Sequence, residues 1–144
     1  MSMEQNKINM RRAIEEFWNK GDYAVMDELA VPNLVTHPLP PAYKNDLAGY
    51  KKYAKETRTA FPDLHFVIED LIAEGDKVVA RFTYTGTHKG QLPSLPAIPP
   101  TFKKVTVTGM VIARIGAQGK AEELYSENNE LSLLQQLGVV PVPA

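Results

Sequence analysis

The chain contains no cysteine, which excludes disulfide bonds and thiol catalysis. It has no apolar run of about 18 residues that could span a bilayer, and its polar beginning lacks the hydrophobic stretch of a signal peptide. The 16 basic and 17 acidic residues give a formal net charge of -1, so neither nucleic acid nor an anionic membrane is an expected partner. Together these absences predict a cytoplasmic protein.

Recognisable chemical motifs are equally scarce. There is no glycine-rich phosphate loop, nucleophile elbow or dinucleotide fingerprint, and the three histidines lack the close spacing of many metal sites. We therefore expect neither a metal ion nor an organic cofactor. His65 fits a solvated position on a strand, and His88 fits a side chain that fixes a loop. His37 borders a proline-rich loop, where ligand binding or proton transfer and a structural role are equally consistent with its position.

With 144 residues, of which 44% are hydrophobic, the chain is long enough for one substantial core. A domain of this size buries about 68% of the surface of its unfolded chain. We therefore expect a single domain spanning residues 1–144.

The first third of the chain has helical periodicity. Ser2 opens a capping-box pattern, and apolar residues then recur every three or four positions until Gly21. Asp22 is placed to cap a second, shorter helix that stops before a proline. A short strand at residues 33–36 and a third helix at residues 45–61 follow.

Beyond this point the hydrophobic period changes from about 3.6 to 2. Four strands are predicted at residues 64–73, 77–88, 103–115 and 120–127, and a short helix at residues 130–137. Helices followed by long antiparallel strands indicate an α+β fold, in which a strongly curved, cone-shaped antiparallel sheet is covered on its concave face by three N-terminal helices. The conical space between the two layers is either a core or a pocket.

Acidic pairs offer little for catalysis. Glu122 and Glu123 are adjacent on a predicted strand, so their side chains should point to opposite faces and cannot work together. We interpret both as solvated charges.

Several strings in the correct order identify a family that the sequence resembles. "IEDLIAEGDKVVARF", "GTHKG", "KKVTVTG" and "LSLLQQLG" are similar to segments of the SnoaL-like polyketide cyclases, and the likeness extends from residue 17 to residue 138. The resemblance implies the cone-shaped fold of the nuclear-transport-factor-2-like superfamily, and a homodimer formed through the outer sheet face. It also implies intramolecular aldol closure of a polyketide without a metal or organic cofactor.

Three positions depart from the pattern of that family. Asn129 stands where the family has an acid/base aspartate, and an amide cannot act as a Brønsted base near neutral pH. Leu124 stands where many relatives place histidine, and Val111 where they commonly place a polar residue. The expected pocket is therefore poor in ionisable groups.

Such a pocket is suited to a neutral, hydrophobic polycyclic small molecule, such as a steroid, terpenoid or polyketide. We predict a ligand-binding protein with little or no cyclase activity. The ligand-binding residues that we expect are Trp18, His37, Tyr50, Tyr53, Tyr84, Val111, Leu124 and Asn129.

Three alternatives remain open. The chain could be a cyclase or isomerase that uses another base, with His37 as the first choice, or a dimeric interaction module with a filled core. The pattern would also fit a family member redesigned as a binder. In the binding interpretation, the proline clusters at residues 32–41 and 93–100 stiffen the open end of the cone.

Overall fold

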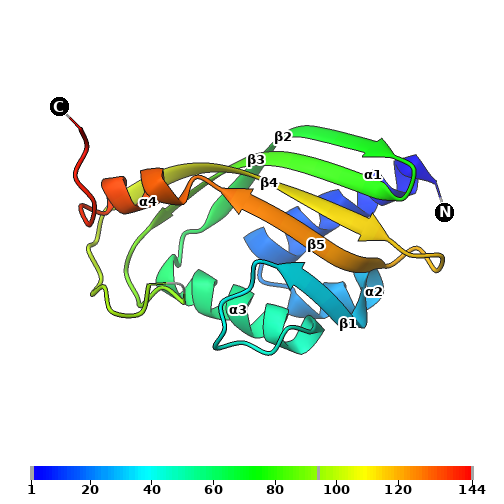
Figure 1. Cartoon of the computed structure of the whole chain (residues 1–144), viewed down its shortest axis with the longest axis horizontal. Helices are drawn as coiled ribbons and strands as arrows, with labels where there is room; N and C mark the ends of the chain where they lie inside the picture. The colour runs from blue at the N-terminus through cyan, green and yellow to red at the C-terminus, as the bar shows by residue number, and fades with distance from the viewer. Residues whose placement is uncertain (1, 94, 144) are drawn as a thin grey trace.

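The computed structural model describes residues 2–93 and 95–143. Its five strands form one curved sheet in the order β1-β5-β4-β3-β2, and the N-terminal helices lie against one face of it (Figure 1). The predicted α+β architecture is confirmed. The strands are β1 (Ala30–His37), β2 (His65–Glu74), β3 (Lys77–Thr87), β4 (Lys104–Ile115) and β5 (Ala121–Asn128). The helices are α1 (Met3–Arg12), η1 (Ala13–Asn19), η2 (Tyr23–Val25), α2 (Met26–Leu29), α3 (Leu47–Ala60) and α4 (Glu130–Gln136).

The sheet is antiparallel from β2 through β5, as expected, but β1 joins the edge of β5 in the parallel sense. The expectation of a wholly antiparallel sheet is therefore wrong at this edge. β1 is also longer than the predicted strand, because it begins directly after α2. The alternation predicted for β3 is confirmed, since Val78, Ala80, Phe82 and Tyr84 are all buried.

The N-terminal helical segment begins and ends where the sequence predicted. The side chain of Ser2 accepts a hydrogen bond from the backbone N–H of Gln5 at 3.0 Å, and Gly21 ends the segment with a φ of 71°. Within it, η1 is π-helical, a widening that a 3.6-residue period does not reveal. Asp22 makes no side-chain cap, so that prediction is wrong; its backbone N–H instead bonds to the carbonyl of Glu16 at 2.9 Å.

Three carboxamide side chains attach helical segments to the sheet. Asn19 bonds to both the N–H and the C=O of Phe66 on β2, at 2.7 and 2.9 Å. Asn45, in the loop before α3, does the same to Thr36 on β1 at 2.8 and 3.0 Å. Gln136 of α4 pairs with Thr106 of β4 at 2.8 Å in both directions. Each pair satisfies strand backbone groups that no neighbouring strand reaches.

The core consists of two clusters of buried residues. One lies between the first helices and the sheet and includes Phe17, Leu34 and Tyr50. The other lies towards α4 and includes Phe61 and Tyr84. Trp18, Phe66 and Val111 pack against both clusters and so connect them. Among the helices of the described residues, none has the length and apolar character needed to cross a membrane.

Leu34 tests the longer β1 strand, because its side chain is fully buried in the first cluster. We expect Leu34→Ala to lower the free energy of unfolding by about 2 to 5 kcal/mol, measured by urea denaturation. The exposed neighbour Asn33 supplies the control, since Asn33→Ala should change the free energy of unfolding by no more than about 0.5 kcal/mol. Equal effects at the two positions would contradict the inward orientation of Leu34.

Candidate functional site

A small internal cavity lies between the helices and the inner face of the sheet. Its volume is about 50 Å³, and four of the predicted ligand-binding residues line it: Trp18, Tyr50, Val111 and Leu124. The remaining lining is apolar except for Asn6 and Asn9, and it includes no acidic, basic or histidine side chain. The cavity therefore provides an uncharged environment.

Aromatic rings form one wall of this cavity. The indole N–H of Trp18 donates to the hydroxyl of Tyr50 at 3.1 Å, and the ring of Phe17 stacks on that of Tyr50 at 5.5 Å between centroids. Tyr53 packs edge-on against Trp18. Burial raises the pKa of both tyrosines, so they remain neutral hydrogen-bonding groups at physiological pH.

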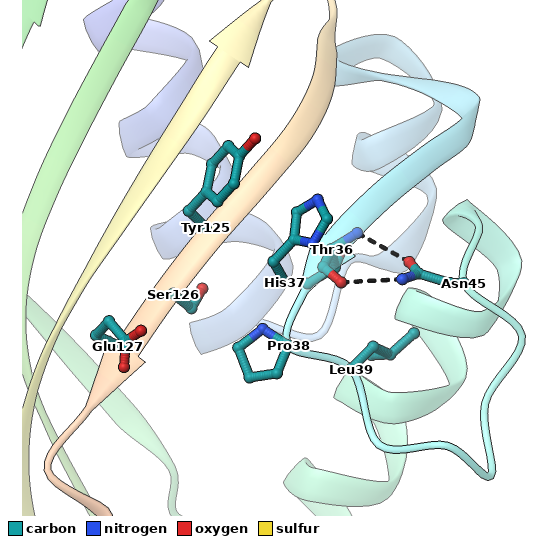
Figure 2. A pocket seen from close by; sticks show the side chains of 8 residues that line it. All are labelled: Thr36, His37, Pro38, Leu39, Asn45, Tyr125, Ser126 and Glu127. Carbon is teal, nitrogen blue, oxygen red and sulfur yellow. Dashed lines mark hydrogen bonds between the residues drawn. The ribbon is translucent and has the colours of Figure 1, made fainter.

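A much larger open cleft of about 520 Å³ lies where β1 ends and β5 continues. Figure 2 shows it between the end of β5 and the loop from β1 to α3. Polar and apolar side chains line it together: Thr36, His37, Pro38, Leu39, Asn45, Tyr125, Ser126 and Glu127. Four residues of the first proline cluster, Thr36 to Leu39, thus form part of its wall, whereas residues 93 and 95–100 of the second cluster line neither space.

The cleft and the internal cavity are adjacent, because residues that are paired across β4 and β5 line one or the other. Ser126, which lines the cleft, is the direct partner of Val111 in the β4–β5 ladder, and Val111 lines the cavity. Leu124, two residues before Ser126 and on the same face, also lines the cavity. A molecule in the cleft would therefore be separated from the internal cavity only by side chains such as those of Ser126 and Val111.

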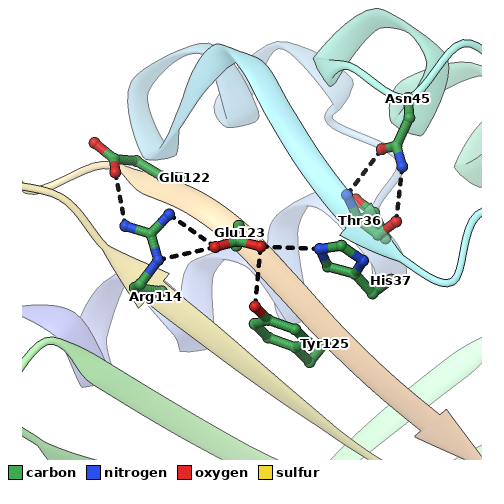
Figure 3. Close-up of polar contacts among 7 residues, drawn as sticks. All are labelled: Thr36, His37, Asn45, Arg114, Glu122, Glu123 and Tyr125. Atoms are coloured by element: carbon green, nitrogen blue, oxygen red, sulfur yellow. Dashed lines mark hydrogen bonds and ion pairs between the residues drawn. The ribbon is translucent and has the colours of Figure 1, made fainter.

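The outer face near the cleft carries a charged cluster centred on Glu123 (Figure 3). Its carboxylate receives hydrogen bonds from His37 Nε2 and the Tyr125 hydroxyl, both at 2.9 Å, and from the guanidinium of Arg114 at 2.9 and 3.1 Å. These partners, His37 first, lower the pKa of Glu123 to about 2. The same guanidinium also contacts Glu122 at 2.8 Å, so these two acids, which both keep contact with solvent, share one cation.

A second polar group lies at the other end of β5, where α4 begins. Asn128 follows Leu124 and Ser126 on the inner face, and its Oδ1 is buried without a hydrogen-bond partner among the described residues. Glu130 is the first residue of α4, and partial desolvation raises the pKa of its carboxyl. Neither residue was predicted, although the period-2 alternation of β5 places Asn128 on the inner face.

The structure separates the remaining predicted residues. Tyr84 belongs to the second core cluster, and His37 lies in the cleft with its Nε2 held by Glu123. Asn129 caps α4, because its Oδ1 accepts a hydrogen bond from the N–H of Ser132 at 3.1 Å. Five of the eight predicted residues therefore lie together: Trp18, Tyr50, Tyr53, Val111 and Leu124. The other three, His37, Tyr84 and Asn129, lie elsewhere.

The other two histidines occupy the structural positions that the sequence predicted. His65 is exposed at the start of β2. His88 is fully buried, and its Nδ1 accepts a hydrogen bond from the backbone N–H of Thr101 at 3.1 Å. This contact fixes the end of the second proline-rich loop, and burial lowers the pKa of the ring.

The Glu123 cluster predicts a pH-dependent stability. Because the folded pKa of about 2 lies below the model-compound value of 4.5, Glu123 should stabilise the fold above pH 4.5 and lose this contribution as the pH falls towards 2. Glu123→Gln should therefore lower the Tm at pH 7, and the difference from the original chain should shrink at pH 3. Glu74→Gln, in the exposed β2–β3 hairpin, is the control; a difference for Glu123→Gln that is independent of pH would contradict the prediction.

Solved structures with the same fold are numerous. TsrD from Streptomyces laurentii is 26% identical and superimposes with a TM-score of 0.86, covering 97% of this chain and 99% of its own. IdmH from Streptomyces antibioticus, a candidate polyketide cyclase, is 26% identical with a TM-score of 0.76, covering 94% and 99%. AclR from Streptomyces galilaeus, a candidate hydroxylase, is 26% identical with a TM-score of 0.81, covering 99% and 91%.

No protein with a curated description matches the sequence. The sequence profile of the SnoaL-like polyketide cyclases, however, matches residues 8–137, which is nearly the whole chain. The curved sheet, the helices on one face and the short C-terminal helix agree with this assignment. The chain belongs to the SnoaL-like polyketide cyclase family, within the nuclear-transport-factor-2-like superfamily.

Proposed function

We propose that the chain binds a neutral, hydrophobic polycyclic small molecule with a few carbonyl or hydroxyl groups, of the polyketide type. The observation that carries this proposal is the uncharged, aromatic lining of the internal cavity next to an open cleft of about 520 Å³. Small-molecule sites commonly measure about 300 to 1,000 Å³ and combine apolar walls with few polar groups. The cleft alone has a suitable size.

The ligand would lie in the cleft with its apolar end directed past Ser126 towards Val111. In this position, the hydroxyl of Ser126 and the ring of Tyr125 are within the cleft lining and can contact its polar edge. The internal cavity of about 50 Å³ is too small for a ring system, so deeper binding requires side chains such as Leu124 to repack. If they do not repack, the interior remains a filled core, as the interaction-module alternative assumes.

Cyclisation that depends on the family's aspartate is not part of this proposal. Asn129 occupies that position, and loss of a general base typically costs about 10² to 10⁴ in rate. The names of the structural neighbours include both a cyclase and a hydroxylase, which supports a shared fold that hosts different reactions. Catalysis by this chain would need another proton acceptor.

Binding predicts a thermal shift. A panel of neutral steroids, terpenoids and polyaromatic ketones should include compounds that raise the Tm, because a ligand at 100 times its Kd stabilises the fold by about 2.7 kcal/mol. A panel in which every compound leaves the Tm unchanged would refute the proposed class of ligand.

The position of the ligand is tested by two adjacent residues on opposite faces of β4. Val111→Phe adds bulk beside the cleft and should weaken binding at least about tenfold, a loss of about 1.4 kcal/mol. Met110→Phe, on the outer face and 49% exposed, should leave the Kd unchanged. Ser126→Trp provides a second block at a partly exposed site; normal binding by both blocked variants would rule out this location.

We further propose that the protein forms a homodimer through its outer sheet face. Four large apolar side chains are exposed there, at 42 to 59%: Val67, Ile72, Met110 and Tyr125. Ile72 and Tyr125 belong to one apolar row across the sheet, through Val79 and Ile112, and contiguous exposed apolar surface is typical of protein interfaces. Sedimentation should give twice the mass of the chain, and Ile72→Lys should shift the equilibrium towards monomer; a monomeric original chain at micromolar concentration would contradict the dimer.

A further inference from the structure

The lining of the cleft contains a buried hydroxyl without a hydrogen-bond partner. Thr36 is 4% exposed and lines the cleft, and no group among the described residues bonds to its Oγ1. Native proteins leave few buried polar side-chain atoms unpaired, because each such atom has lost its hydrogen bonds to water. The Thr36 hydroxyl is therefore a group that a bound molecule can satisfy.

The backbone on which this hydroxyl sits is held at both edges of β1. On one edge, the amide of Asn45 bonds to the N–H and the C=O of Thr36 at 2.8 and 3.0 Å (Figure 2). On the other edge, Thr36 is paired with Leu124 of β5, which lines the internal cavity. Ser126, two residues further along the same face of β5, lines the cleft. Thr36 thus lies at the boundary between the cleft and the internal cavity.

The other hydrogen-bonding side chains of the cleft wall already have partners or keep contact with solvent. His37 and Tyr125 both bond to Glu123 at 2.9 Å. The amide oxygen and nitrogen of Asn45 bond to the backbone of Thr36. Two further polar residues of the lining remain accessible to water, which can satisfy them: Ser126 and Glu127. The Thr36 hydroxyl is thus the group of this wall with most to gain from a ligand.

We propose that the Thr36 hydroxyl donates a hydrogen bond to a carbonyl oxygen of the bound molecule, so that the cleft selects polycyclic ketones over their carbonyl-free counterparts. The inference rests on the proposed binding function and names the group that the site recognises. Rotation about the Cα–Cβ bond exchanges the hydroxyl and the methyl group of threonine, so the hydroxyl can turn to a molecule in the cleft. A carbonyl oxygen accepts its proton and brings no donor that would itself need a buried partner.

The choice of threonine at this position favours recognition over packing. Valine has nearly the same shape, is equally suited to a strand, and has no polar group to bury. Because a methyl group in place of an unpaired buried hydroxyl removes the cost of desolvation, Thr36→Val should raise the Tm of the ligand-free protein in a thermal denaturation experiment. A lower Tm would mean that the hydroxyl has a structural partner within the fold, and it would overturn the inference.

Pairs of probes that differ only in one carbonyl group test the selectivity. Fluorenone is matched by fluorene, and xanthone by xanthene. We expect the original chain to bind the ketone of each pair about five- to tenfold more tightly than its counterpart, because the counterpart leaves the buried hydroxyl unpaired. Titrations followed by the fluorescence of Trp18, the single tryptophan of the chain, give the two Kd values of each pair.

Variants assign the selectivity to the hydroxyl. Thr36→Val should weaken the binding of both ketones about five- to tenfold without weakening that of their counterparts, and Thr36→Ser, which keeps the hydroxyl, should retain the preference for ketones. Thr108→Val makes the same change at an exposed position of β4 and should leave every Kd unchanged. The infrared C=O stretching band of bound fluorenone should lie at lower wavenumber in the original chain than in Thr36→Val, because a donated hydrogen bond weakens the C=O bond.

The outcomes separate this inference from the proposed function. An unchanged preference for ketones in Thr36→Val, or an infrared band at the same wavenumber in both proteins, overturns the role of Thr36 and leaves the binding function standing. Equal losses for a ketone and its counterpart give the hydroxyl a structural role and have the same consequence, as does binding of other panel compounds without affinity for either ketone. Failure of the whole panel and of the probes to bind overturns the binding function, and the inference with it.

Discussion

Three carboxamide side chains determine how the helices sit on the sheet, and the interior depends on them. Asn19, Asn45 and Gln136 each pair with both backbone groups of one strand residue. Each side chain replaces a missing strand neighbour. An unpaired buried N–H or C=O costs about 1 to 3 kcal/mol, which applies to the partly buried contacts of Asn19 and Asn45, whereas the contacts of Gln136 are exposed. Asn45 also lines the cleft, which means that the same contact attaches the loop before α3 to β1 and shapes the proposed site.

Much of this architecture follows from local patterns in the sequence. The alternation of β3, the cap at Ser2 and the end of the first helical segment at Gly21 depend on neighbouring residues, and all were predictable. The parallel pairing of β1 with β5 and the contact of His37 with Glu123 join residues more than 80 positions apart. A single sequence contains no signal for such pairings. The π-helical turn at residues 13–19 is a local feature. Because it preserves an apolar face, the spacing of apolar residues does not distinguish it from an α-helix.

The site was predictable only where it is part of the core. Trp18 and Tyr50 lie on apolar helical stripes, Val111 was placed by the family pattern together with strand alternation, and Leu124 by the family pattern; all four line the cavity. Polar groups at the ends of elements follow no such rule. Asn129 was identified from the family pattern, yet the structure uses its Oδ1 as a helix cap.

The capping role of position 129 has a chemical consequence. A carboxylate that caps a helix is stabilised in its charged form by backbone N–H groups, which makes it a weaker base. Asp46 illustrates this within the same chain, because the N–H of Gly49 lowers the pKa of its carboxyl. An aspartate at position 129 in the observed capping geometry would be subject to the same effect. The amide of Asn129 accepts the same kind of hydrogen bond from the N–H of Ser132 without carrying a charge, so the helix keeps its cap whatever the pH.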